Sequence, residues 1–218
     1  MIERYTLTSL EEVAGTFGVA VPAGATPRFN IAPLQIALIR DASAITSARW
    51  GLLPPWRGHG GKRDPHVRHA RIETIDGVPL LRNAFKRQRC LVIADGFFVF
   101  GHGPGGNPSL PVWMHPAPDP ARPHARSRVI AFAGLAATHR DDGQPSFAIL
   151  VGFDGPVVIP ASDYTAWLTG PQAHARALLA SPPRDWRADP VSAWVRSIAH
   201  DDARCVQPVG NPAQGELF

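Results

Sequence analysis

The stretch Phe85-Lys-Arg-Gln-Arg-Cys-Leu-Val-Ile-Ala-Asp-Gly-Phe-Phe-Val-Phe100 is rich in β-branched and aromatic residues, which favours a strand over residues 90–100. Asp95 and Gly96 interrupt the apolar run, and such a pair is typical of a turn or a β-bulge. Successive side chains of a strand point to opposite faces. The alternation therefore predicts that Phe97 and Val99 share one face, with Val99 packed in an apolar wall.

Other short runs of similar composition occur along the chain, separated by Gly, Pro or Asp. They predict strands over residues 36–40, 47–50, 111–114, 129–133, 147–151 and 157–159. Helices are expected over residues 9–17, 162–168, 171–179 and 193–198. Because strands and helices do not alternate as repeating βαβ units, the pattern predicts an α+β fold with a mostly antiparallel sheet.

The composition is typical of a globular protein. The chain has 218 residues, of which 44% are apolar, and this predicts a single domain over residues 1–218. No apolar stretch approaches the about 18 residues of a membrane span, and the N-terminus lacks the pattern of a secretory signal, so we expect a cytoplasmic protein without a membrane partner. The two cysteines, Cys90 and Cys205, have no metal-ligand spacing, so neither a disulfide scaffold nor a metal or cofactor is expected.

Basic residues are concentrated in one segment of the chain. Between Arg57 and Arg89 there are nine basic and three acidic residues, which gives this segment a formal charge of +6, whereas the whole chain carries +4. A patch of this kind is the electrostatic footprint expected for binding to a phosphate backbone. Basic surfaces are common, however, so the charge alone leaves DNA binding and an ordinary solvated surface both open.

Several motifs occur in order along the chain. They are Arg28-Phe-Asn-Ile-Ala-Pro33, Arg49-Trp-Gly-Leu-Leu-Pro-Pro-Trp56, Ala70-Arg-Ile-Glu-Thr74, Phe85-Lys-Arg-Gln-Arg-Cys-Leu-Val-Ile-Ala-Asp-Gly96 and Pro208-Val-Gly-Asn-Pro212. Together these motifs resemble the SRAP (SOS-response-associated peptidase) family of DNA-damage proteins. The resemblance runs from about Arg4 to Asn211 and implies a twisted, barrel-like sheet with peripheral helices.

The same resemblance implies a reaction centre whose residues are replaced in this chain. In the family, a Cys exposed by loss of the N-terminal Met captures the aldehyde of an abasic site, and Ile2 stands at that position here. A family Glu that moves protons during Schiff-base chemistry is replaced by Val99, which cannot transfer a proton. A family Asn is replaced by His69, the only titratable residue at these positions. The family's His-x-Arg-Met-Pro loop has no counterpart, because residues 147–156 run directly into residues 157–159.

Residues that resemble the family's DNA-holding set are retained. Arg4 and Arg71 match family arginines, and guanidinium groups suit contacts with phosphates. Trp50 and Trp56 flank a Gly-Leu-Leu-Pro-Pro turn that resembles a base-stacking wedge. Trp50 also follows a strand, so a place in the core is the alternative for this residue. Together with His69, these four residues form the expected DNA-binding set.

The sequence favours a catalytically degenerate SRAP-like protein that binds single-stranded, junction or abasic-site DNA in an SOS context, of prokaryotic or phage-related origin. One alternative is an abasic-DNA lyase, crosslinking enzyme or autopeptidase that uses the Met1 amine and His69. A second alternative is a scaffold that binds protein and lacks DNA affinity, although the sequence identifies no protein partner. His66 and His69 are three residues apart, but a pair without a third ligand does not predict a metal site.

Overall fold

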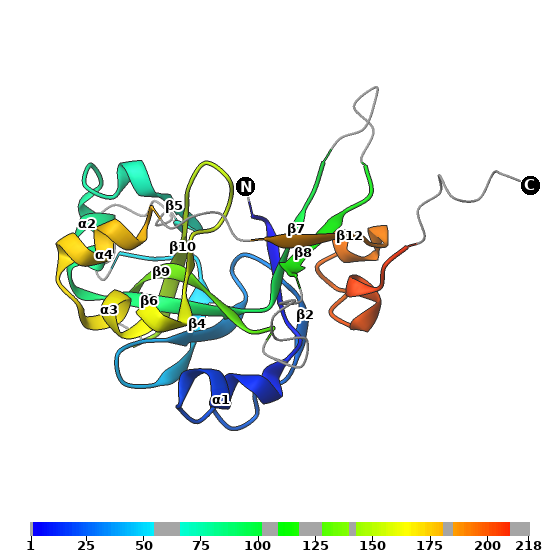
Figure 1. Ribbon diagram of the computed structural model, residues 1–218, viewed down its shortest axis with the longest axis horizontal. Coiled ribbons are helices and arrows are strands. Elements are labelled where there is room, and N and C mark those ends of the chain that lie inside the picture. The colour runs from blue at the N-terminus through cyan, green and yellow to red at the C-terminus, as the bar shows by residue number, and fades with distance from the viewer. Residues whose placement is uncertain are drawn as a thin grey trace, which may run out of the picture.

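The computed structural model describes residues 2–54, 66–101, 109–117, 128–139, 143–180 and 185–209. Five strands close into a barrel in the order β9, β6, β3, β4 and β10, because β10 also pairs with β9. Two further strands extend this sheet, β5 beside β10 and β11 beside β9 (Figure 1). The strands span Ile36–Arg40 (β3), Ile45–Trp50 (β4), His69–Arg71 (β5), Arg89–Ala94 (β6), Ile130–Thr138 (β9), Pro145–Val151 (β10) and Val158–Ile159 (β11).

Most strand pairs in the barrel sheet are antiparallel. The exceptions among the described strands are the pairs that β10 makes with β4 and with β5, which are parallel. The expectation of an α+β fold with a mostly antiparallel, barrel-like sheet is thereby confirmed. The short strand β5 is placed by its parallel register with β10, in which His69 lies opposite Ile149 and Arg71 lies opposite Val151.

A second, fully antiparallel sheet lies beside the barrel, to the right in Figure 1. One face of this sheet packs on the barrel, where Tyr5 and Phe97 meet Phe132 with ring centroids 6.1 and 6.2 Å away. The opposite face buries Phe98 with residues of the C-terminal segment. Its strands follow the order β12-β8-β7-β1-β2 and span Arg4–Leu7 (β1), Arg28–Ile31 (β2), Gly96–Val99 (β7), Val112–Pro116 (β8) and Trp186–Pro190 (β12).

Asp95 divides the apolar stretch of residues 85–100 into two strands. β6 belongs to the barrel and β7 to the second sheet, so the expectation of one continuous strand over residues 90–100 is wrong. The buried carboxylate of Asp95 accepts hydrogen bonds from the Thr6 hydroxyl at 2.5 Å, the Thr8 hydroxyl at 2.7 Å and the Ser9 backbone N–H at 2.8 Å. The expected turn at Asp95 is therefore the joint between the sheets, and it also fixes the end of β1.

Helices cover the outside of the barrel. Leu81, Ala84 and Phe85 form the buried side of α2, and the buried Arg89 donates hydrogen bonds to the carbonyls of Phe85, Trp167 and Gly170. The helices are α1 (Val13–Phe17), α2 (Pro79–Arg87), α3 (Tyr164–Thr169) and α4 (Gln172–Leu178), with 3-10 turns at Leu10–Glu12, Ile72–Thr74, Ala161–Asp163, Ala193–Arg196 and Ala203–Val206. No helix in the described ranges is long and apolar enough to cross a membrane.

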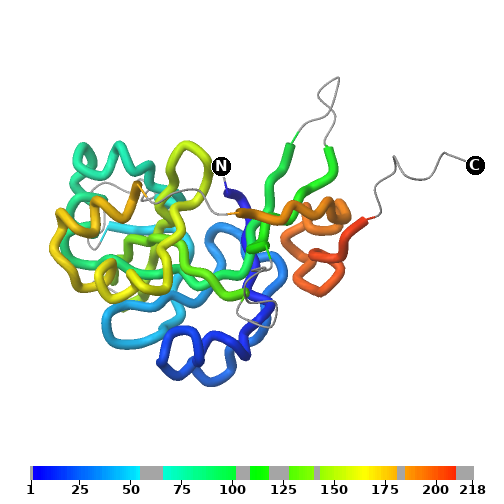
Figure 2. Tube along the Cα trace, in the orientation of Figure 1, coloured from blue at the N-terminus to red at the C-terminus, as the bar shows by residue number. Residues whose placement is uncertain are grey.

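The C-terminal segment covers the outer face of the second sheet, as the orange and red part of the trace in Figure 2 shows. Asp201 accepts hydrogen bonds from the backbone N–H groups of Phe29 at 2.6 Å and Asn30 at 2.8 Å, and it also pairs with Arg28. The Asn30 amide donates to three carbonyls of the segment, including that of His200 at 2.7 Å. These contacts tie residues 195–201 to β2.

Candidate nucleic-acid interface

A cavity of about 460 Å³ opens beside the beginning of β1. Strand β1 places Arg4 on its wall, since Arg4 pairs with Phe98 of the neighbouring β7. The segment that precedes β5 supplies a second arginine, Arg68. The cavity is lined by Arg4, Ala32, Pro33, Leu34, His66, Arg68 and Ile198.

The charge of Glu3 acts on Arg4, but the arginines at and near this cavity form no ion pair within the described ranges. Arg4, Arg68 and Arg71 form no ion pair with any carboxylate in the described ranges, whereas Arg28 pairs with Asp201 and Arg176 with Asp76. Burial lowers the pKa of Arg4, but a guanidinium keeps its charge at neutral pH. The positive charges of Arg4 and Arg68, which both line the cavity, attract an anion.

His69 lies in β5 and packs its ring edgewise against Trp50, with ring centroids 5.6 Å apart. Burial, together with the positive charges of Arg68 and of the N-terminus, lowers its pKa to about 4, although a hydrogen bond to the backbone of Ile2 acts in the opposite direction. The imidazole is therefore neutral at pH 7. The buried Nε2 atom has no hydrogen-bond partner within the described residues.

The structure separates the expected DNA-binding residues. Arg4 and His69 lie around the N-terminal strand, and Arg71 is exposed at the end of β5. Trp50 has 0% of its surface exposed, because its ring lies against Tyr5 at 5.2 Å and its indole N–H donates to the Arg68 carbonyl at 2.8 Å. The expectation that Trp50 stacks on a base is wrong, and the core alternative holds. The remaining tryptophan of that set, Trp56, lies outside the described residues.

The described part of the basic segment, residues 66–89, is not a continuous basic surface either. Arg68, Arg71 and Arg82 are exposed, but Arg89 is buried and its three hydrogen bonds anchor helices to the barrel. The prediction that residues 57–89 form one DNA-binding face is wrong for Arg89. Its hydrogen bonds instead hold α2 and α3 at the barrel.

The two replaced positions of the family's reaction centre differ in environment. Ile2 is buried with 1% of its surface exposed, and Val99 is 44% exposed. The expectation that Val99 is packed in an apolar wall is wrong. Phe97, on the same face of β7, reaches the barrel core, but Val99 stands at the last position of the strand, where neither core cluster covers it.

No cluster of three potential metal ligands occurs in the part of the chain that the structure describes, and His66 and His69 therefore gain no third ligand there. Sequence reasoning missed other residues of the site. Leu34 lines the cavity with a left-handed backbone, φ 72°, which is unusual for a leucine, and has 46% of its surface exposed. Arg68 was visible only as one of many basic residues in its segment.

The fold and the site define a small α+β barrel protein with a cationic cavity beside its first strand. Residues 1–152 match the model of the family described as SOS response associated peptidase (SRAP), and this chain belongs to that family.

Curated relatives match the chain over part of its length. The abasic site processing protein YoaM of Bacillus subtilis is 35% identical over 106 residues, which cover 45% of this chain and 46% of YoaM. The abasic site processing protein YoqW of Bacillus phage SPbeta is 33% identical over 106 residues, with 45% of this chain and 47% of YoqW covered. The chain thus matches a little under half the length of these relatives.

Solved structures share the fold. A protein from Bacteroides thetaiotaomicron superposes with a TM-score of 0.77 at 17% identity, and the match covers 94% of this chain and 99% of that one. A phage-related protein from Bordetella bronchiseptica gives a TM-score of 0.67 at 24% identity, with 87% and 93% covered. At these identities the likeness concerns the fold alone.

Proposed function

We propose that this chain is a catalytically degenerate, single-domain SRAP protein that binds single-stranded or junction DNA, including strands with an abasic site, without forming a covalent bond. Its setting is a DNA-damage response in the cytoplasm of a bacterium or its phage. The observation that supports binding most directly is the pair of arginines, Arg4 and Arg68, which line one cavity and form no ion pair within the described residues. The names of the curated relatives, abasic site processing proteins, support the substrate class.

The state of the nucleophiles supports the absence of covalent chemistry. Cys90 and Cys205 are both buried, and burial raises the pKa of each thiol, so the reactive thiolate is disfavoured. Ile2 has no thiol, and Val99 has no carboxylate. His69 is neutral at pH 7, and its buried Nε2 atom has no hydrogen-bond partner among the described residues, so we assign it no catalytic role.

Binding is tested by fluorescence anisotropy with a labelled oligothymidine at several salt concentrations. The affinity should fall steeply between about 50 and 200 mM salt, because each phosphate neutralised by an arginine releases condensed counterions. Arg71→Ala and Arg68→Ala should each weaken binding for every sequence alike, since phosphate contacts carry no base information. Each should also lower the salt slope by about 0.7.

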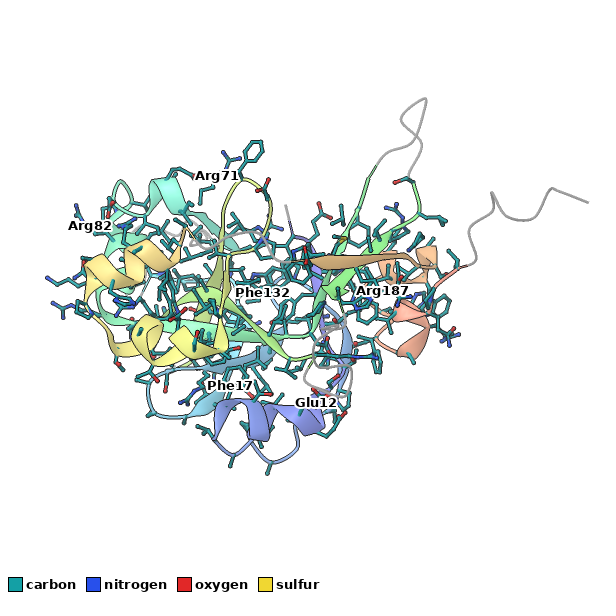
Figure 3. All side chains as sticks on the ribbon, viewed as in Figure 1. Glu12, Phe17, Arg71, Arg82, Phe132 and Arg187 are labelled. Carbon is teal, nitrogen blue, oxygen red and sulfur yellow. The ribbon has the colours of Figure 1, made fainter. Side chains whose placement is uncertain are left out.

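Arg82→Ala is the matched control, because it removes the same charge from the exposed side of α2 (Figure 3). This variant should bind nearly as the parent protein does. If the parent protein does not bind at low salt, or if Arg68→Ala and Arg71→Ala bind like Arg82→Ala, the proposal is wrong and a protein-binding role gains support.

A further inference from the structure

The turn between β10 and β11 exposes an aromatic side chain completely. Phe153 has 101% of its reference surface exposed, more than any other large apolar residue in the described ranges. Its neighbour Asp154 is exposed as well. Isolated exposed apolar residues are common, but a phenylalanine that contacts nothing at the tip of a turn exposes a whole ring to water.

Backbone hydrogen bonds fix the conformation of the turn that carries Phe153. The Gly152 N–H donates to the Gly155 carbonyl at 2.9 Å, and Val151 and Pro156 form an antiparallel bridge just below it. Gly155 has φ +135°, a conformation that favours glycine. The hairpin is therefore closed immediately beneath Phe153, in the place where the family resemblance implies a longer loop with a catalytic His.

Arg71, an expected DNA-binding residue, lies next to this turn. Strand β5 runs parallel to β10, and their register places Arg71 opposite Val151, two residues before Phe153. Figure 3 shows Arg71 beside the tip of this hairpin. An exposed ring in the turn after β10 thus lies near an exposed guanidinium at the end of β5 that forms no ion pair within the described residues.

We infer that Phe153 stacks on an unpaired base of the DNA strand whose phosphate is bound by Arg71. The affinity then depends on whether a base is present next to the bound phosphate. This inference rests on the proposed function. A single strand offers a negatively charged backbone and apolar base faces at neighbouring positions, and single-strand-binding proteins use this pairing of cationic and aromatic side chains. The carboxylate of Asp154 disfavours a phosphate at the tip itself, so the ring meets a neutral base.

The test compares two oligonucleotides of equal length, an oligothymidine and a strand whose bases are all replaced by tetrahydrofuran abasic units. Both carry the same phosphates, but only the first can stack. The parent protein should bind the oligothymidine at least about fivefold more tightly, the equivalent of about 1 kcal/mol. Phe153→Ala should remove this preference and leave affinity for the abasic strand unchanged. Arg71→Ala should weaken both complexes and preserve the ratio.

Two substitutions separate stacking from apolar contact. Phe153→Trp should keep or raise the preference for bases, whereas Phe153→Leu should lose most of it. Val78→Ala serves as the control, since it truncates another exposed apolar residue, 39% exposed at the start of α2, and should change neither affinity.

The two proposals fail in different ways. If the parent protein binds neither strand at low salt, the proposed function fails and the inference falls with it. If the parent protein binds and Arg71→Ala weakens binding, but Phe153→Ala keeps the parent's preference for bases, only the inference is overturned. A parent protein that binds both strands equally well also overturns it.

Discussion

Replacing Asp95 by alanine should destabilise the protein more than any surface substitution, because this carboxylate joins the two sheets. Its side chain is 1% exposed and accepts hydrogen bonds from two hydroxyls and two backbone N–H groups, those of Thr8 and Ser9. The hydroxyls can turn toward other acceptors, but the two N–H groups cannot. A buried donor left without a partner costs about 1–3 kcal/mol, so the two together predict a loss of about 2–6 kcal/mol.

Urea unfolding followed by tryptophan fluorescence measures this loss. The midpoint should fall while the slope of the free energy against urea stays constant, because the surface exposed on unfolding is nearly unchanged. Asp95→Asn should lose less, since its amide oxygen still accepts part of the set. Asp154→Ala removes an exposed carboxylate and should stay within about 0.5 kcal/mol of the parent. A loss below about 1 kcal/mol for Asp95→Ala would refute the view that Asp95 fastens β1 to the joint.

Three further substitutions test the environments of the other replaced or buried residues. The pKa of His69 is about 4 in the folded chain and about 6.5 in the unfolded chain. As the pH falls, the unfolded chain therefore binds the proton before the folded chain does. The free energy of unfolding should fall by up to about 2 kcal/mol between about pH 6.5 and pH 4. His69→Asn should remove that part of the pH dependence in urea unfolding, and an identical pH dependence in both proteins would argue against a neutral, half-buried ring. Val99→Glu should change the free energy of unfolding by less than about 0.5 kcal/mol, because Val99 is 44% exposed; a melting temperature lowered by many degrees would mean that Val99 is packed after all. Arg89→Met should cost about 2–4 kcal/mol, since three carbonyls lose their donor, and a calorimetric melting temperature equal to the parent's would contradict this role.

Local composition was sufficient to predict many of the elements. Residues 36–40 form β3 as expected, and the predicted helix over 171–179 corresponds to α4. Helix α2 was missed, although the spacing of Leu81, Ala84 and Phe85 is that of one buried helical face. Strands β1, β2, β5 and β12 are short, three to five residues each, and depend on their partners more than on their own composition.

The site was harder to predict because distant segments build it. Nothing in the composition of residues 69–71 or 147–151 indicates that they pair in parallel, and this pairing brings Arg71 next to the turn with Phe153. Trp50 ends a strand, so the sequence allows its side chain to face either the core or solvent. In the closed barrel the side chain faces the core and is fully buried. The alternation in β7 correctly predicts that Phe97 faces the core. The sequence does not show how much of this strand face the barrel covers, and Val99 lies outside the covered part.

The most direct test of the central claim, binding of DNA without covalent capture, is a denaturing gel of the full chain incubated with a single strand that carries one abasic site. A parallel native gel at low salt establishes that the complex has formed, and half of each sample is treated with borohydride to reduce any imine between an amine and the ring-opened aldehyde. We expect a shifted band in the native gel and none in the denaturing gel, with or without borohydride. A denaturation-resistant band without borohydride would show a stable covalent adduct, and a band only with borohydride would show an imine intermediate; either result would contradict the account.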